Sequence, residues 1–209
     1  MLYETTTLPN GIRIATREMP PMKSVSVGIW VSVGGRHEPA ELCGISHFLE
    51  HLLFKGTKRR SAKDITEEVE GLGGFINAFT TEDHTCFYAK AGAKQLPVVA
   101  DVLCDMFLNS VFAEQEIERE RDVIREEILM YRDQPAHYSQ ELLTEAMWPA
   151  HALGRPLTGS IDSVNAIKRR DLLDYVTRSY TGLTTIVTVA GNCTHSEVVK
   201  LFSARLVMM

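Results

Sequence analysis

The chain has 209 residues, 44% of them apolar and 23% charged, which is enough to bury one full core and lies near the upper size of a usual domain. Its net charge of −5, with no long lysine- or arginine-rich stripe, excludes the electrostatic pattern of proteins that bind nucleic acid or anionic membrane surfaces. No run of about 18 apolar residues occurs, so we expect no membrane-spanning segment and no membrane partner.

The four cysteines are scattered and form no Cys-x-x-Cys pair. No secretory apolar segment precedes them, which favours a reducing compartment over a disulfide framework. We therefore expect a cytoplasmic protein whose thiols are free. The cysteines are Cys43, Cys86, Cys104 and Cys193.

The first predicted elements are strands. Residues 2–7 and 12–17 flank a Pro9-Asn10-Gly11 turn, a pattern typical of a hairpin. Aliphatic residues at every second position from Val25 to Val33 predict a third strand with one apolar face. Gly34 and Gly35 would end that strand.

The next segment, residues 41–54, has helical spacing and carries His47-x-x-Glu50-His51. Two histidines at i and i+4 project from one side of a helix within reach of one ion, and Glu50 lies beside them without having to be a ligand. The apolar residues of the segment fall on the opposite side, where they can pack on a sheet. Ligand type and spacing both indicate zinc, although two unrelated surface histidines would give the same letters.

Residues 62–71 are predicted to form another helix, and residues 75–80 and 85–91 a second hairpin. A helix over 95–109 follows, and then a longer helix over 113–131 that offers carboxylates for the same ion. The stripe of this longer helix that we expect to be buried consists of Ile117, Ile124, Ile128 and Tyr131.

A catalytic zinc needs a third protein ligand and one position left for water. Glu127 lies on the edge of the apolar stripe of helix 113–131, whereas Glu126 points away from it. Glu127 is therefore the predicted inward carboxylate, and Glu120, two turns earlier, is predicted to orient a ligand or to face substrate. Without the histidine motif upstream, a structural salt bridge would be the simpler interpretation of Glu127.

The last part of the chain is predicted to contain helices over 137–147 and 163–178, a strand over 184–190, and a final helix that begins at the capping-box pattern Thr194-x-x-Glu197. Strands segregated from helices indicate an α+β fold, an antiparallel sheet covered by helices. No linker or repeat divides the sequence, so residues 1–209 are expected to form a single domain.

The motif His47-Phe48-Leu49-Glu50-His51, with Leu52 to Thr57 after it, resembles the family of pitrilysin, insulysin and the mitochondrial processing peptidases, and above all its short bacterial members. The segment from Glu118 to Glu127 carries the same resemblance. In that family the third ligand lies about 76 residues after the second histidine, which again selects Glu127. The family's acidic residue one heptad before this ligand maps to Glu120, which the resemblance makes a catalytic residue.

The resemblance implies a zinc-dependent endopeptidase that hydrolyses peptides or small unfolded polypeptides, with His47, His51 and Glu127 as metal ligands. Glu50 would act as general base and then as general acid. The family's Gly-x-x-Asn-Ala segment maps to residues 74–78, so residues 75–80 would form an edge strand to which a peptide adds in extended form. Asn77 and Ala78 would then lie nearest the scissile bond.

Family members join two such domains around a peptide-sized chamber, and the second domain supplies an arginine and a tyrosine that hold substrate. This sequence matches only the catalytic, N-terminal-type domain. We therefore expect the partner to be a second family domain or subunit, in a homodimer or a heterodimer, in addition to the peptide substrate.

Two other functions are compatible with parts of the sequence. The same helix motif occurs in S-ribosylhomocysteine lyases, where a cysteine completes the site, and Cys86 or Cys104 would then replace Glu127. A non-catalytic binding or assembly subunit of a peptidase complex is the other alternative, although such subunits typically lose the motif. The remaining histidines lack partners at ligand spacing and are interpreted as structural: His37, His84, His137, His151 and His195.

Overall fold

In the computed structural model, which describes residues 2–207, six strands form one sheet in the order β1-β2-β6-β3-β5-β4. Neighbouring strands are antiparallel except β2 and β6, which run parallel. The predicted antiparallel sheet is thus mixed at this one junction, because the chain reaches β6 through a long helical crossover and not through a hairpin. The strands are β1 (Glu4–Thr7), β2 (Arg13–Glu18), β3 (Ser24–Val31), β4 (Phe75–Thr80), β5 (Thr85–Gly92) and β6 (Thr185–Gly191).

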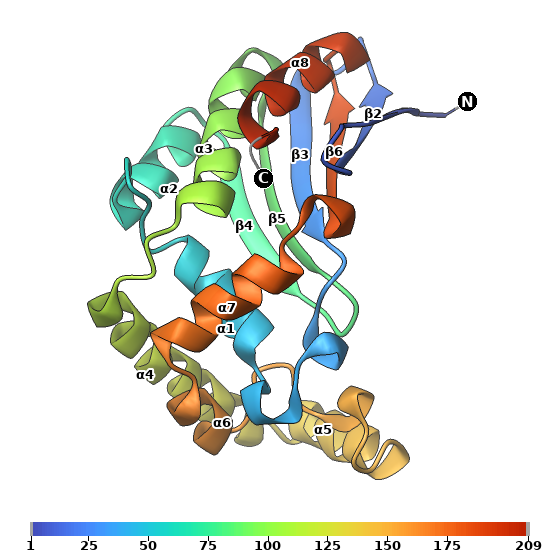
Figure 1. Cartoon of the computed structure of the whole chain (residues 1–209). Helices are drawn as coiled ribbons and strands as arrows, with labels where there is room; N and C mark the ends of the chain where they lie inside the picture. Colours follow the sequence, from blue (N-terminus) through green and yellow to red (C-terminus); the bar gives the residue numbers. More distant parts are fainter. Residues whose placement is uncertain (1, 208–209) are drawn as a thin grey trace.

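Eight α-helices are found among the described residues, and the α+β class is confirmed. Helices α1, α2, α3 and α8 pack on one face of the sheet, while α4, α5 and α6 extend beyond its end (Figure 1). In the part of the chain that the structure covers, no helix is long and apolar enough to span a bilayer. The helices are α1 (Ile45–Leu53), α2 (Ala62–Glu70), α3 (Leu96–Asn109), α4 (Glu114–Arg132), α5 (Pro135–Met147), α6 (Ile161–Ala166), α7 (Arg169–Ser179) and α8 (His195–Leu206).

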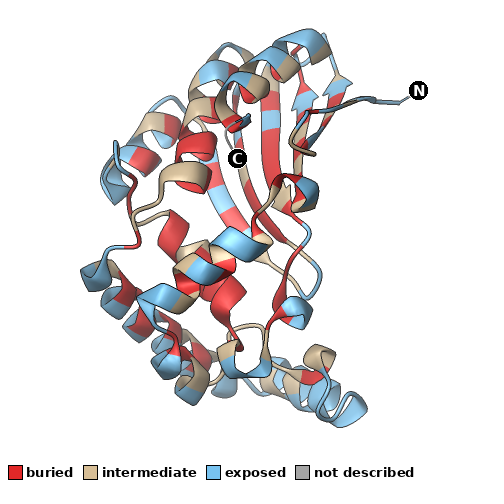
Figure 2. Ribbon diagram, viewed as in Figure 1, coloured by how far each residue is buried: buried red, intermediate tan, exposed pale blue. Residues whose placement is uncertain are grey.

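The core lies between the sheet and the helices on its covered face, as the alternating burial along the strands shows (Figure 2). In β3 the side chains of Val25, Val27 and Ile29 are all buried, as their period-two spacing predicts. Val27 pairs with Ala89 of β5 and with Val189 of β6, so the apolar stripe crosses the sheet. Each such side chain contributes about 1.5–3 kcal/mol to the free energy of folding when fully buried. The buried stripe therefore stabilises the sheet surface on which α1 packs.

Two predicted helices are interrupted. Segment 41–54 forms a short 3-10 turn, and α1 begins only after Gly44, whose φ of 91° is left-handed and unsuited to residues with a Cβ. Segment 163–178 divides into α6 and α7 because Arg121 donates hydrogen bonds to the carbonyls of Val164 and Ile167. In a continuous helix these carbonyls would accept hydrogen bonds from backbone N–H groups. Here they accept them from the Arg121 side chain.

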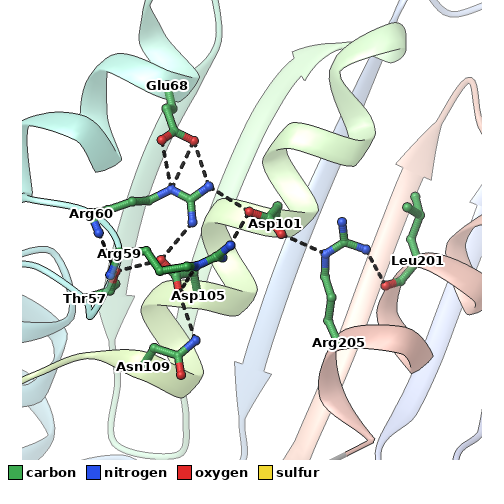
Figure 3. A network of polar contacts seen from close by, with 9 residues as sticks. All are labelled: Thr57, Arg59, Arg60, Glu68, Asp101, Asp105, Asn109, Leu201 and Arg205. Atoms are coloured by element: carbon green, nitrogen blue, oxygen red, sulfur yellow. Dashed lines mark hydrogen bonds and ion pairs between the residues drawn. The ribbon is translucent and has the colours of Figure 1, made fainter.

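A polar network fixes the turn that follows α1 (Figure 3). Asp105 of α3, whose side chain is fully buried, accepts hydrogen bonds from Thr57, Arg59 and Arg60. Arg60 also pairs with Glu68 of α2, so the turn is joined to two helices at once. The whole network consists of Thr57, Arg59, Arg60, Glu68, Asp101, Asp105, Asn109 and Arg205, with the Leu201 carbonyl.

Candidate metal centre

The three predicted ligands come together where α1 packs against α4. His47 and His51 lie one turn apart on α1, with ring centroids 4.6 Å apart. Glu127 Oε2 of α4 lies 3.5 Å from His47 Nε2 and 3.6 Å from His51 Nε2. One potential donor atom from each residue falls within 4.8 Å of the other two, so a single cation can reach all three.

The chemistry of this donor set suits a zinc ion. Two imidazoles and one carboxylate are typical of catalytic zinc sites, which keep a fourth position open. A histidine binds a metal only in its neutral form, and burial, followed by the neighbouring His51, lowers the pKa of His47 to about 4 against the opposing effect of Glu127. His47 is therefore neutral at pH 7, with Nε2 turned toward Glu127.

Glu120 lies beneath the centre and contacts a ligand, not the open cleft. Its side chain is only 6% exposed, and its Oε2 accepts a hydrogen bond from His51 Nδ1 at 3.0 Å. Lys55 Nζ lies 2.7 Å from Oε1. Burial works to raise the pKa of Glu120, but the bonds from His51 and Lys55 outweigh it and lower the pKa. A carboxylate on Nδ1 fixes the tautomer of His51 and leaves Nε2 for the ion.

Glu50 is the second acid of the α1 motif and lines the cleft in front of the ligands. Thr80 of β4 donates a hydrogen bond of 2.6 Å to its Oε2. Burial raises the pKa of Glu50 above its ordinary value, although the bond from Thr80 and the nearby His51 oppose the shift. The hydroxyl thus fixes one carboxylate oxygen and holds Glu50 apart from the ligand set.

The cleft has a volume of about 420 Å³ and extends from His47 and Glu127 toward α5 and residues 153–158. Among its lining residues are Tyr131 and His137, whose rings stack 4.2 Å apart with an interplanar angle of 11°. The Glu127 carboxylate raises the pKa of Tyr131 to about 12. Tyr131, which is predicted to lie in a buried stripe, is half-buried at the cleft wall; its position four residues after Glu127 was the available signal.

Strand β4 is the edge strand of the sheet, as predicted, and leads into the cleft through Phe79 and Thr80. Asn77 is exposed and Ala78 is buried at 9% exposure. The Asn77 side-chain carbonyl accepts a hydrogen bond from the Ala78 N–H at 2.9 Å. This side chain therefore protects an edge amide that an added strand would use.

The alternative cysteine ligands and two of the remaining histidines lie away from the centre. Cys86 and Cys104 are buried free thiols outside the ligand cluster, and burial raises the pKa of each to about 12. Neither thiol belongs to the group of donor atoms that lie within 4.8 Å of one another, so the geometry favours Glu127 over both cysteines. His84 packs against Trp30, and His195 bonds Thr6, so both have structural contacts.

The family described as insulinase, peptidase family M16, matches residues 13–160, which is most of the chain. The chain belongs to this family. The matched region begins in β2 and includes both helices of the candidate metal centre, α1 and α4.

An uncharacterized zinc protease of Mycobacterium leprae is 43% identical over 206 residues, covering 97% of this chain and 46% of that protein. The mitochondrial-processing peptidase subunit beta of Rattus norvegicus is 38% identical over 198 residues, covering 95% and 40%. The crystal structure of a protease from Helicobacter pylori superposes with a TM-score of 0.94 at 25% identity, covering 98% and 50%. The chain thus spans half or less of the length of these relatives.

Proposed function

We propose that this insulinase-family domain is the catalytic half of a zinc-dependent endopeptidase that hydrolyses peptides or small unfolded polypeptides. The observation that carries the proposal is the convergence of two imidazoles and one carboxylate, from α1 and α4, on one point at the end of a cleft. Relatives named zinc protease and mitochondrial-processing peptidase support the choice of metal and reaction. His47, His51 and Glu127 would hold the ion.

When bound, zinc supplies Lewis-acid polarisation of a water molecule and of the scissile carbonyl. Glu50 is the proposed general base. Its Oε2 is fixed by Thr80, so Oε1 is the atom that would take a proton from the attacking water and deliver it to the leaving amine.

We infer that the peptide binds along β4 as an added strand. The Ala78 N–H is at the open edge of the sheet, and the short swing of one side chain, that of Asn77, uncovers it. A peptide carbonyl would then replace the Asn77 oxygen on this amide, and the freed Asn77 amide could bond the same peptide. The strand leads to Thr80 and hence to Glu50, which brings an extended peptide to the proposed base.

The test is replacement of Glu50 by Gln, in a protein that includes the remaining length found in its relatives. We expect full zinc content and a loss of peptide cleavage of about 10²–10⁴-fold, because proton transfer is removed while the ligands are kept. Cleavage of a quenched peptide and zinc content by mass spectrometry are the measurements. Glu126→Gln, on the exposed side of α4, is the control. Chelator-insensitive cleavage by the unaltered protein would refute the proposal, as would an active Glu50→Gln variant.

The cytoplasmic location stays a prediction. Its basis is the four free cysteines, which remain buried as thiols. Fractionation of cells that produce the protein is the direct measurement.

A further inference from the structure

Glu38 is a buried acid outside the ligand set that the mechanism above does not use. It lies between two short 3-10 turns, Gly35–His37 and Ala40–Leu42, and is only 5% exposed. Burial raises the pKa of Glu38, against hydrogen bonds from Ser46 and Gly44 that lower it. Burying a carboxylate costs free energy unless its oxygens are hydrogen-bonded. The hydrogen-bond donors to these two oxygens therefore indicate what the Glu38 side chain does.

Both oxygens of Glu38 bind the amino end of the helix that carries the metal motif. Oε2 accepts a hydrogen bond from the Gly44 N–H at 2.7 Å, and Oε1 accepts one from the Ser46 N–H at 2.8 Å. Gly44 is the N-cap of α1 and has no side chain to cap the first turn. Glu38 supplies that cap from six residues upstream, and its charge lies at the positive end of the helix dipole.

The capped turn leads directly into the metal ligands. His47 follows Ser46 in the chain, and His51 lies one turn further along α1. An axial shift or a rotation of this short helix moves both imidazoles together relative to Glu127 on α4. Zinc tolerates deviations of only about 0.2 Å in its ligand distances, so the position of the first turn matters for the centre.

Glu38 is also bonded to a residue that lines the cleft. Its backbone carbonyl accepts a hydrogen bond of 2.8 Å from Arg155 Nη2. Arg155 lines the cleft together with the residues on either side of it, Gly154 and Pro156. One residue therefore joins the start of α1, through its carboxylate, to the loop that faces the ligands, through its carbonyl.

We propose that Glu38 is a positioning residue of the metal centre, which sets the start of α1 so that His47 and His51 meet Glu127 before any ion arrives. The inference rests on the proposed function, because it assigns Glu38 to the same metal centre. Glu120 bonds His51 near the carboxyl end of α1, and Glu38 bonds the backbone at its amino end, so α1 is fixed at two separate points.

The test uses Co²⁺ as the probe, since its visible absorption reports coordination geometry. In Glu38→Gln the side chain keeps its size, but an NH₂ group faces one of the two backbone amides and the charge is lost. We expect Co²⁺ to bind about 10–100-fold more weakly, the range found for groups that orient metal ligands, with an altered absorption spectrum. Glu41→Gln changes an exposed acid three residues away and should bind as the unaltered chain does.

The outcomes separate this inference from the proposed function. If the unaltered chain binds no Co²⁺ or Zn²⁺, the proposed function fails. If it binds, and folded Glu38→Gln has the same affinity and spectrum with only a lower melting temperature, Glu38 is structural and the inference is wrong. If Glu38→Gln does not fold, hydrogen exchange of the metal-free chain decides: the Gly44 and Ser46 amides should be strongly protected, and rapid exchange there would overturn the inference.

Discussion

At the scale of single residues, the clearest distinction lies between two adjacent glutamates of α4. Glu127 faces the two imidazoles, whereas Glu126 is exposed. The helical period alone separates them, since neighbouring residues are rotated by about 100°. Chemically identical side chains one position apart therefore differ in whether they can bind the ion.

Replacing Glu127 by Gln should weaken zinc binding by at least about 10-fold, because even groups that only orient ligands contribute about 10–100-fold to metal affinity. The matched control is Glu126→Gln, which changes the same charge one position along the chain. Competition with a chelator of known affinity measures both variants. Equal affinities for Glu127→Gln and the unaltered chain would show that another group completes the centre.

At the scale of elements, the position of α1 depends on the polar contacts at its two ends. The turn after α1 is fixed by Asp105, on which burial acts to raise the pKa. Hydrogen bonds led by those of Thr57 and Arg60 outweigh burial and lower the pKa of Asp105 to about 2, from an ordinary 3.8. The folded state therefore binds this proton less tightly than the unfolded state does.

A depressed carboxylate pKa contributes stability above the unfolded value, and this contribution is lost as pH falls through the folded value. Asp105 should thus contribute up to about 2 kcal/mol at pH 7, which disappears between about pH 4 and pH 2. Asp105→Asn should lower the free energy of unfolding at pH 7 and flatten its decline in that window. Urea unfolding at several pH values measures this. Asp122→Asn, an exposed acid of α4, should leave both quantities unchanged.

The elements that sequence predicts best are those whose signal is local. The strand from Val25 follows from period-two spacing, and the motif on α1 from the i and i+4 positions of two histidines. The break between α6 and α7 was missed because its cause, Arg121, lies more than forty residues away in the chain. The parallel pairing of β6 with β2 was missed because these two strands also lie far apart in the chain.

The residues of the candidate metal centre and its cleft also divide into those that a local sequence signal predicts and those that it does not. His47, Glu50 and His51 belong to one helix, and Glu127 follows from the apolar stripe of another. Tyr131, His137 and Arg155 meet at the cleft only through the packing of α4, α5 and the loop after it. Their sequence neighbourhoods carry no shared period, so spacing could not group them.

At the scale of the whole molecule, the chain covers 46% of its relative from Mycobacterium leprae and 50% of the Helicobacter pylori protease chain. The cleft is open, and α5, which forms one of its walls, has no buried residue. Because the side chains of this wall stay accessible to water, a peptide bound there would be incompletely enclosed, and electrostatic polarisation of its carbonyl would be weaker. By contrast, all three candidate metal ligands lie within the part of the chain that the structure describes.

This chain alone should therefore suffice for metal binding, whereas efficient cleavage should also need the remaining length of its relatives. We expect the 209-residue chain alone to bind one zinc ion through His47, His51 and Glu127, yet to cleave a quenched peptide at least about 10-fold more slowly than a protein with the remaining length of its relatives, since an enclosing wall positions substrate and excludes water. Adding the remaining length of its relatives as a separate chain should restore cleavage in proportion to complex formation. Equal kcat/KM for the chain alone and for the longer protein would mean that this domain carries the complete catalytic site.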